Sequence, residues 1–375
     1  MIDSYGRTID YLRLSVTELC NFRCGYCMPP EGVCKRSHDE ICSLEELTEL
    51  AAACVELGVK KIRLTGGEPL VRRGILSLVK ALRALPGLEE LDMTTNGSLL
   101  PALAAPLRDA GLDRLNISLD SLRPERYRAI TRLGSLDQVL AGIAAAEQAG
   151  FDKLSINVVL LKGVNEDELR SLAELAREKP WQVRFIELMP IGPGAELGAF
   201  LPARRVLEAV PELKEATGNG QQATASVGAV IGRPQEASGN GHQATASVGA
   251  VIGRPQEASG IRQQATASVG AVIGRPPLPA RSGVARLYTA PGWAGTVGLI
   301  TPMSCEFCGD CSRIRITADG NLKLCLHSAE EIPLRGLHGE ALRAAILAAV
   351  ARKPARHHLL EAQSQSARPM NRIGG

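Results

Sequence analysis

The stretch Leu12–Gly32, LRLSVTELCNFRCGYCMPPEG, is the part of the sequence that most constrains the fold and the chemistry. It predicts a short apolar strand followed by a loop that carries Cys20, Cys24 and Cys27. The spacing C-x3-C-x2-C allows the three thiols to face one point. A [4Fe–4S] cluster normally takes four cysteine thiolates, so three leave one iron without a protein ligand. The loop therefore predicts a cluster with one iron open to a small molecule.

Other interpretations of the three cysteines fit the loop less well. Structural zinc takes four protein ligands, usually with C-x2-C pairs, and the nearby Cys34 and His38 break that pattern. A disulfide-bonded secreted loop would need an oxidising compartment. The loop also holds polar and turn-forming residues, namely Asn21, Arg23, Gly25, Pro29 and Pro30. They count against three unconnected core cysteines.

Length and composition indicate a globular α/β enzyme. The 375 residues suffice for one large barrel-like domain or two ordinary ones. Apolar residues make up 45% and aromatic residues only 3%, so we expect a core of Leu, Val, Ile and Ala. The net charge of +3 is too small to predict a nucleic-acid partner, and it is compatible with an anionic substrate.

The sequence gives no sign of a membrane or secreted protein. The N-terminus lacks the apolar segment of a signal peptide, and no uninterrupted apolar run approaches the ~18 residues of a membrane span. Ten cysteines without a signal peptide predict reduced thiols that are available to metal. We therefore expect a cytoplasmic protein.

Strands and helices alternate through the first half of the chain. The predicted strands are Leu12–Val16, Lys61–Thr65, Leu91–Thr95, Arg114–Leu119, Leu154–Leu160 and Val183–Leu188. The predicted helices are one that begins at a capping box, Ser43–Glu46, and runs to Gly58, then Ile75–Leu85, Leu99–Ala110, Leu136–Ala149 and Glu166–Glu178. Such alternation implies parallel strands with right-handed crossovers. The fold class is thus α/β, an incomplete (β/α)6 TIM-like barrel.

Polar or glycine-rich residues follow every predicted strand. They are the cysteine loop, Thr65–Pro69, Thr94–Gly97, Ser118–Asp120, Lys162–Gly163 and Glu187–Pro190. A plain turn would explain any one of them. Parallel barrels bind their ligands at the carboxyl ends of the strands. Six such segments at the same ends predict the active site there.

The middle of the chain contains an exact repeat. Residues 222–234, 243–255 and 264–276 share the sequence QATASVGAVIGRP at a period of 21 residues. We expect residues 215–282 to form an inserted, mobile surface loop with weak hairpin potential, and a folded binding repeat is the alternative. The predicted organisation is a partial barrel (1–214), this insert (215–282) and a C-terminal region (283–375).

The C-terminal region carries a second cysteine set. A predicted hairpin, with a turn at Asp319–Gly320, brings Cys325 back towards Cys308 and Cys311. Zinc is a serious alternative for this set. The candidates for a fourth ligand are Cys305 and His327. A helix follows around Glu340–Ala351, and the chain ends in Gly374–Gly375, which is either a frayed end or a thin strand able to enter a narrow pocket.

Taken together, the first cysteine loop, the Gly-Gly-Glu-Pro segment from Gly66, the second cysteine set and the terminal Ile-Gly-Gly resemble the GTP 3′,8-cyclase family. That family belongs to the radical S-adenosylmethionine enzymes and begins molybdenum cofactor biosynthesis. The resemblance implies two [4Fe–4S] clusters, S-adenosylmethionine and GTP. A 5′-deoxyadenosyl radical takes the 3′ hydrogen of GTP, and the product is (8S)-3′,8-cyclo-7,8-dihydroguanosine 5′-triphosphate.

The resemblance also implies roles for particular residues. Cys20, Cys24 and Cys27 would hold the first cluster, and Cys308, Cys311 and Cys325 the second, which holds guanine. Tyr26, Gly67, Ser118 and Met189 match positions that contact S-adenosylmethionine. Arg13, Arg63, Thr94, Arg313 and Arg315 match positions that contact GTP, and the last two are also candidate catalytic residues. Rigid, permanently charged guanidinium groups suit a triphosphate.

Three further residues bear on the GTP site. The resemblance places Arg184 near the substrate, and the tail would bring Arg372 near the nucleotide or cofactor. Ser155 stands where the family carries a lysine. We expect Lys153, two residues earlier on the same strand, to compensate for that change.

The implied partners are an external electron donor, the downstream cyclic pyranopterin monophosphate synthase and, as one arrangement, a second copy in a homodimer. No nucleic acid is expected. A radical enzyme that matures peptides is the nearest rival, but it would need more cysteines than the four that follow Cys54. A non-catalytic electron carrier or zinc scaffold would close its sites with four protein ligands.

Overall fold

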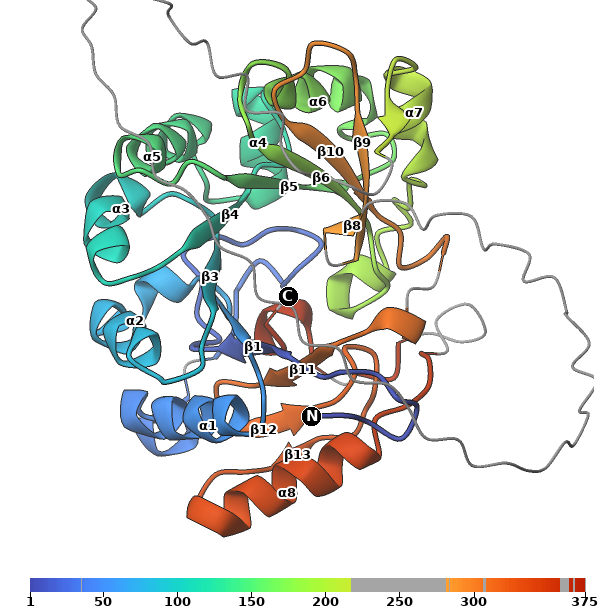
Figure 1. The fold of residues 1–375 in the computed structure, drawn as a ribbon. Coiled ribbons are helices and arrows are strands. Elements are labelled where there is room, and N and C mark those ends of the chain that lie inside the picture. Colours follow the sequence, from blue (N-terminus) through green and yellow to red (C-terminus); the bar gives the residue numbers. More distant parts are fainter. Residues whose placement is uncertain are drawn as a thin grey trace, which may run out of the picture. The chain divides into compact units, whose positions relative to one another are not determined.

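The fold is built on a 13-stranded sheet that does not close into a complete barrel (Figure 1). The computed structural model describes residues 1–34, 36–216, 281–282, 284–305, 308–357, 364–366 and 368–374. Met1–Gly218 and Pro279–Gly375 form one compact unit. All three repeats fall in the other unit, Asn219–Leu278, so the predictions about them lie outside the described residues.

Six parallel strands pair in sequence order and form the half-barrel that the sequence predicts. They are β1 (Tyr11–Ser15), β2 (Lys61–Thr65), β3 (Glu90–Thr95), β4 (Arg114–Ser118), β5 (Ser155–Leu160) and β6 (Gln182–Glu187). Because side chains alternate along a strand, each strand directs one set of side chains to the helices and the other into the lumen. The predicted fold class is confirmed.

Helices cover the outer face of these strands, as Figure 1 shows. They are α1 (Leu44–Glu56), α2 (Ile75–Arg83), α3 (Leu100–Asp109), α5 (Leu136–Gln148) and α6 (Leu169–Glu178). The capping box is present: the Glu46 amide donates to Ser43 Oγ at 3.1 Å, and the Ser43 amide donates to Glu46 Oε2 at 2.7 Å. The predicted first turn of α6 is instead a 3-10 turn, Glu166–Glu168.

Two short helices were not predicted from the sequence. They are α4 (Pro124–Thr131) and α7 (Arg204–Ala209). Each is too short to show a clear helical period. In α4 the buried side chains are Tyr127, Ile130 and Thr131, among charged neighbours. This helix nonetheless supports the first cysteine loop, as shown below.

Strands from the C-terminal part of the chain extend the half-barrel at both edges. Next to β1 lies β11 (Arg313–Ile316), and next to β6 lies β10 (Thr296–Ile300), both in parallel pairing. The predicted hairpin is formed by β11 and β12 (Asn321–Lys323), with β13 (Ile332–Pro333) beyond it. On the other edge β10 pairs with β9 (Ala285–Thr289), which also pairs with β7 (Lys214–Glu215) and β8 (Arg281–Ser282).

The last part of the chain returns to the barrel. Helix α8 (Gly339–Ala351) lies beside α1, and the ion pair Arg343–Glu56 joins them at 3.0 Å. A final 3-10 turn, Met370–Arg372, lies close to β1 and β11 in Figure 1. The C-terminal strands and the tail thus form part of the wall around the lumen.

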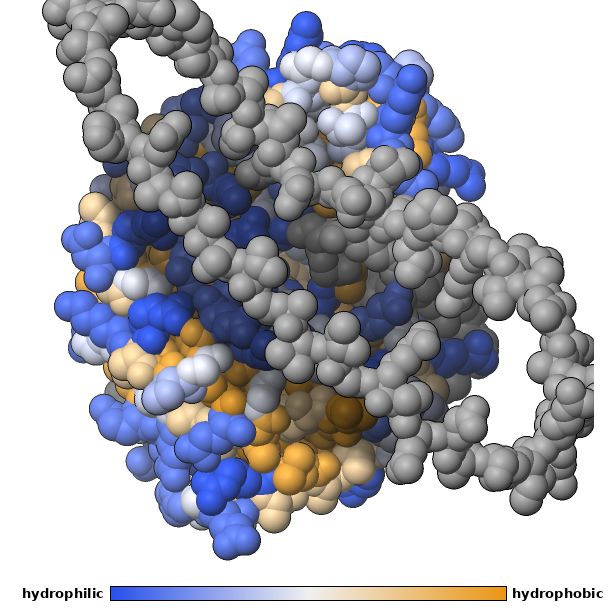
Figure 2. Space-filling model, in the orientation of Figure 1, coloured by the Kyte–Doolittle hydropathy of each residue, from blue (hydrophilic) through white to orange (hydrophobic). Residues whose placement is uncertain are grey.

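The surface is mainly hydrophilic where the helices of the upper half face outward, and an apolar area is visible lower down (Figure 2). None of the helices in the described ranges is both long and apolar enough to cross a membrane.

Candidate active site

One cavity of about 640 Å³ occupies the lumen of the half-barrel. It extends from the loops at the carboxyl ends of the strands to Lys60 and Glu89 at their amino ends. All the candidate site residues line it: Arg13, Cys20, Cys24, Tyr26, Cys27, Arg63, Gly67, Thr94, Ser118, Met189, Cys308, Cys311, Arg313, Arg315 and Cys325. Segments almost 300 residues apart in sequence therefore share one cavity.

The first cysteine loop is a tight turn that is held against α4. The Cys27 amide donates to Cys24 O at 2.9 Å, which closes the turn. The amide of Gly25 donates to Ile130 O at 3.0 Å, so the loop is bonded to the C-terminal end of α4. The helix that the sequence did not predict is therefore a support of the predicted cluster site.

Arg132 completes this support. Its Nη1 donates to the carbonyls of Arg23 at 3.2 Å and of Met28 at 3.1 Å, on either side of the turn. It is the one non-glycine residue of the described chain with a positive φ, 62°. Such a conformation costs about 1–3 kcal/mol and persists where the surroundings fix it, often at functional sites. No sequence signal identifies this arginine.

The glycine pair after β2 packs directly on the first cysteine loop. The Gly67 amide donates to Thr17 O at 2.8 Å. A Cβ on Gly67 would lie 2.4 Å from Leu19 O, closer than any side chain can approach. Glycine is therefore required here by contact, and it brings the β2 loop to the edge of the cluster site.

Glu68 anchors the same loop from beneath. Its carboxylate accepts hydrogen bonds from Thr95 Oγ1 and the Asn96 amide, both at 2.7 Å, and from the Leu70 amide at 3.0 Å. Burial raises the pKa of Glu68 to about 7. The loops after β2 and β3 are thereby joined beside the first cysteine loop.

The three cysteines of the first set are partly buried around the lumen. Burial raises the pKa of Cys20 to about 11 and of Cys27 to about 12, and it raises the pKa of Cys24 well above its usual value. The thiolate is the metal ligand, so metal binding displaces these protons. Three soft sulfur ligands on one loop suit iron in an iron–sulfur cluster. In the described ranges, no three His, Cys, Asp or Glu side chains are grouped to share a single metal ion.

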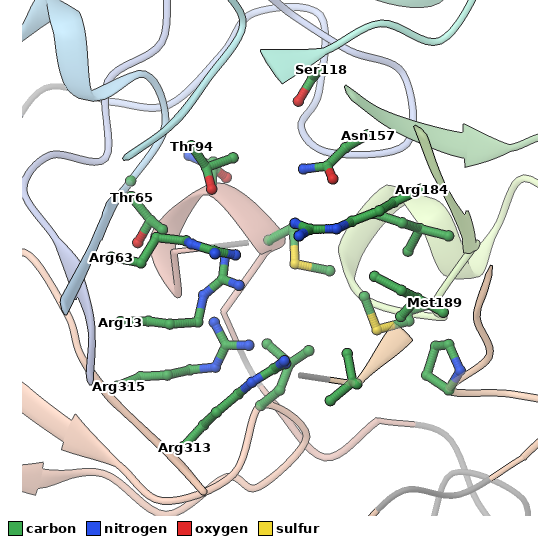
Figure 3. Close-up of a pocket in the computed structure, with 18 of the residues that line it drawn as sticks. Arg13, Arg63, Thr65, Thr94, Ser118, Asn157, Arg184, Met189, Arg313 and Arg315 are labelled. Carbon is green, nitrogen blue, oxygen red and sulfur yellow. The ribbon is translucent and has the colours of Figure 1, made fainter. Parts of the chain in front are cut away.

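The S-adenosylmethionine candidates line the carboxyl-end part of the cavity. Tyr26 donates its hydroxyl to Asp120 Oδ2 at 2.7 Å, and Asp120 Oδ1 accepts from the Val159 amide at 2.8 Å. Burial raises the pKa of Asp120 to about 6. Ser118 and Met189 face the lumen from different sides (Figure 3). Asp120, at the end of β4, thus fixes the orientation of Tyr26.

Strand pairing places the GTP-site arginines side by side. In the register of three parallel strands, Arg13 of β1 lies between Arg63 of β2 and Arg315 of β11. Arg313 is two residues before Arg315 and so faces the same side. Figure 3 shows these four arginines pointing into the cavity from one side and Arg184 from the other.

These cations are held inside a buried cavity, where their charge is costly. Burial lowers the pKa of Arg184 to about 9 and of Arg315 to about 10, so both remain charged at neutral pH. Burial, together with the neighbouring Arg315, also holds the pKa of Arg13 well below its usual value. An anion in their midst would favour the charged forms. The lumen therefore suits a ligand with several negative charges.

The arginines also have protein partners that hold them in place. Arg63 donates to Asp92 Oδ2 at 2.6 Å, and Lys61 contacts the same oxygen at 2.9 Å. Arg184 donates to Asn116 Oδ1 at 2.7 Å and to Gln182 Oε1. Side chains oriented in this way can meet a ligand with little reorganisation.

The second cysteine set is at the start and end of the β11–β12 hairpin. Cys308 and Cys311 flank a 3-10 turn, in which the Cys311 amide donates to Cys308 O at 3.2 Å. Arg7 donates to that same carbonyl at 2.8 Å. Lys353 donates to the carbonyls of Arg313 at 2.9 Å and of Leu324 at 2.5 Å.

These two basic residues also act on the charge of one thiol, that of Cys311. Burial raises the pKa of Cys311, but Lys353, Arg313 and Arg7 more than offset it, so the net pKa lies below the usual value. A cationic setting favours the thiolate that a metal requires. The contacts of Arg7 and Lys353 with this set could not be predicted, because each residue lies far along the chain from the cysteines.

The candidate fourth ligands of a zinc site lie in different surroundings. Cys305 accepts a hydrogen bond from Arg286 at 3.0 Å and does not line the cavity. His327 does line it; its ring packs edge-on against His357 at 5.0 Å, and Nδ1 is 3.3 Å from Ser364 Oγ. Burial lowers the pKa of His327 to about 3, so the ring is neutral at neutral pH.

The tail enters the lumen, although one residue is not where it was expected. Gly374 O accepts from Arg315 Nη1 at 2.7 Å and from Arg13 Nε at 3.2 Å. Gly374 has a φ of +69°, and a Cβ there would lie 2.4 Å from Thr65 Oγ1. Arg372, expected near the nucleotide or cofactor, does not line the cavity; it pairs with Glu18 at 3.2 Å.

The expectation about Lys153 was wrong. Lys153 is exposed just before β5 and does not line the cavity, because the strand begins only at Ser155. Ser155 is buried and does not line the cavity either. Cations that line the amino-end half of the lumen come from other strands: Lys60 directly before β2, Lys61 in β2, and Arg114 in β4.

Two family descriptions match parts of this chain, and curated relatives match its whole length. Residues 14–176 match the Radical SAM superfamily, and residues 261–359 match Molybdenum Cofactor Synthesis C. The chain is 42% identical over 390 residues to the GTP 3′,8-cyclase of Moorella thermoacetica, with all of both chains covered. It is 41% identical over 380 residues to the GTP 3′,8-cyclase of Peptoclostridium acidaminophilum, which covers 100% of this chain and 98% of the relative.

Among solved structures, Streptococcus suis SuiB bound to S-adenosylmethionine matches 55% of this chain and 47% of its own. The TM-score is 0.45 and the sequence identity 17%.

Proposed function

The chain belongs to the GTP 3′,8-cyclase family, and we infer that GTP is cyclised in its lumen as a step of molybdenum cofactor synthesis. The observation that carries this inference is that both cysteine sets and the arginines line one cavity. A radical reaction needs its cofactor, substrate and electron source within reach of one another. The lumen offers one enclosed place for all three.

The first cysteine set suits a [4Fe–4S] cluster that leaves one iron for S-adenosylmethionine. Three thiols supply that ligand set, held by the α4 end and Arg132. When bound, this cluster supplies the electron that cleaves S-adenosylmethionine and so the 5′-deoxyadenosyl radical. The remaining steps depend on how the chain positions the two ligands.

For S-adenosylmethionine, the chain offers a narrow and mostly preformed site. Gly67, which has no side chain, lets a ligand approach the backbone of the β2 loop. Asp120 holds the Tyr26 hydroxyl and so fixes the ring beside the first cysteine set. Ser118 can donate to a ribose oxygen, and Met189 offers an apolar, adaptable contact to the adenine.

For GTP, the arginines provide the recognition of the triphosphate. Arg13, Arg63 and Arg315 form a row across three strands, and Arg313 and Arg184 face the same cavity. Guanidinium groups bind phosphate oxygens through paired hydrogen bonds, and the enclosed cavity strengthens each one. Fixing the phosphates at these strands would hold the ribose 3′ carbon towards the carboxyl-end loops, where the radical forms.

We assign a second [4Fe–4S] cluster to Cys308, Cys311 and Cys325, with an open iron for the guanine base. Lys353 and Arg7 support this assignment, because both lower the pKa of Cys311. Arg7 also donates to Cys308 O, and Lys353 donates to the carbonyl of Leu324, next to Cys325. A base held at this end and phosphates held by the arginines would span the lumen. The 3′ carbon and C8 of the same nucleotide would then lie between the two cysteine sets.

The partners follow from the chemistry. The first cluster needs an electron for each cleavage of S-adenosylmethionine, and an external donor supplies it. The cyclised product then passes to cyclic pyranopterin monophosphate synthase. We place the enzyme in the cytoplasm, where thiols remain reduced and available to metal. A homodimer is the assembly that we propose.

The two-cluster proposal is tested by metal content. Anaerobically reconstituted protein should contain about eight irons per chain, because each cysteine set would hold a four-iron cluster. Cys27→Ser should halve that number and abolish cleavage of S-adenosylmethionine, whereas Cys34→Ser, an exposed cysteine outside the cavity, should change neither. Four irons and one tightly bound zinc in the unmodified protein would refute the second cluster.

A further inference from the structure

Tyr11 occupies a central position that the proposed roles do not explain. It lies on β1 and faces the lumen two residues before Arg13. Its register neighbours are Lys61 on β2 and Arg313 on β11. The side chain is only 7% exposed.

Three cations surround the Tyr11 ring. Arg313 lies 5.3 Å from the ring centroid, Arg63 5.4 Å and Lys61 5.5 Å. A ring face attracts cations, and the interaction strengthens when water is excluded. Tyr11 therefore holds together the ends of three basic side chains that come from different strands.

The hydroxyl of Tyr11 has no hydrogen-bond partner among the described residues, although it is fully buried. A buried hydroxyl that is left unpaired costs free energy. A phenylalanine would fill the same space and attract the same cations without that cost. The hydroxyl is thus explained by neither packing nor a protein hydrogen bond, but a ligand in the cavity would supply its partner.

The chemistry of the surroundings specifies that ligand. The three cations that contact the ring, Lys61, Arg63 and Arg313, all line the lumen. A phosphate oxygen is drawn to these cations and accepts hydrogen bonds from hydroxyl donors. Resting on the proposed function, which brings GTP into this lumen, we propose that Tyr11 is a further nucleotide-binding residue. Its hydroxyl donates a hydrogen bond to the phosphate chain.

The variant that tests this proposal is Tyr11→Phe, which removes the hydroxyl oxygen and keeps the ring. The probes are GTP and inorganic triphosphate, titrated calorimetrically into the anaerobic holoenzyme. Loss of a hydrogen bond to a charged acceptor should weaken both Kd values by about tenfold to a hundredfold. The variant should bind as much iron as the unmodified protein. Without nucleotide its unfolding temperature should not be lower, because the unpaired hydroxyl is removed. Tyr288→Phe, on strand β9 and outside the cavity, is the control and should change nothing.

The outcomes separate this proposal from the proposed function. Unmodified holoenzyme that does not bind GTP would contradict the proposed function itself. If it binds GTP and Tyr11→Phe binds both probes equally well, the assignment of Tyr11 is wrong. It is also wrong if GTP binding weakens while triphosphate binding does not, because the hydroxyl would then contact the nucleoside. Weakening of both, with iron content and stability retained, establishes the contact.

Discussion

At the scale of single residues, the site depends on side chains whose roles appear only in three dimensions. The cysteine spacing identified the two candidate ligand sets, whose cysteines line one cavity in the structure. Arg7, Arg132 and Lys353 could not be predicted, since each acts on the backbone of a distant segment. Tyr11 gave no signal either, because an aromatic residue in a strand is ordinarily part of the core.

Arg132→Gly tests the support of the first cysteine loop. Glycine tolerates the positive φ, so relief of about 1–3 kcal/mol of strain offsets the lost hydrogen bonds and the fold should remain stable. The first cluster should nevertheless bind about 10–100-fold more weakly, as when the outer support of other metal sites is removed. The measurement is iron release to a chelator under anaerobic conditions, in which half of the iron should become labile.

The control for this prediction is Arg128→Ala; Arg128 is an exposed arginine on α4, the helix that Arg132 follows. It should release iron at the rate of the unmodified protein. Equal retention of iron by Arg132→Gly and Arg128→Ala would show that the guanidinium group does not hold the loop.

At the scale of elements, the six strands of the half-barrel and six of the helices, α8 included, could be predicted, because their apolar periods and caps are continuous in the sequence. The parallel pairing of β11 with β1 could not, and it is this pairing that puts Arg315 beside Arg13. The partner of an edge strand depends on the whole fold. For the tail, the sequence likewise showed only that the last two residues are glycines. The contact of Gly374 with two arginines became visible in the structure.

Removing Gly374 and Gly375 should damage the radical step and leave the iron content unchanged. The cysteines lie upstream, whereas Gly374 O is bonded to Arg13 and Arg315 in the lumen. A misplacement of about 1 Å in an active site can cost a hundredfold in rate. Formation of 5′-deoxyadenosine and of cyclised nucleotide should therefore fall by about that factor.

Gly374→Ala gives a finer version of the same test. Its Cβ would meet Thr65 Oγ1 at 2.4 Å, so it should also impair turnover. Gly198→Ala, with a φ of +58° and no atom within 4 Å of the added Cβ, imposes comparable backbone strain outside the cavity and should leave turnover unchanged. Rates equal to those of the unmodified protein for the truncated chain would make the tail an ordinary chain end.

At the scale of the whole molecule, one half-barrel collects functional groups from both ends of the chain. The segment with the three repeats leaves from β7 and returns at β8, and both of these strands pair with β9. The chain therefore departs and comes back beside the same strand, β9. The sequence identified this segment by its repetition, while the enclosure of the cavity by strands from before and after it emerged only from the fold.

The central claim is that the lumen brings the radical to the 3′ carbon of GTP. It is tested by incubating the reduced holoenzyme anaerobically with S-adenosylmethionine and GTP deuterated at C3′, and measuring the mass of the 5′-deoxyadenosine formed. The account predicts that the 5′-deoxyadenosine gains one deuterium and forms together with the 3′,8-cyclised nucleotide. Unlabelled 5′-deoxyadenosine, formed alongside unchanged GTP, would contradict it.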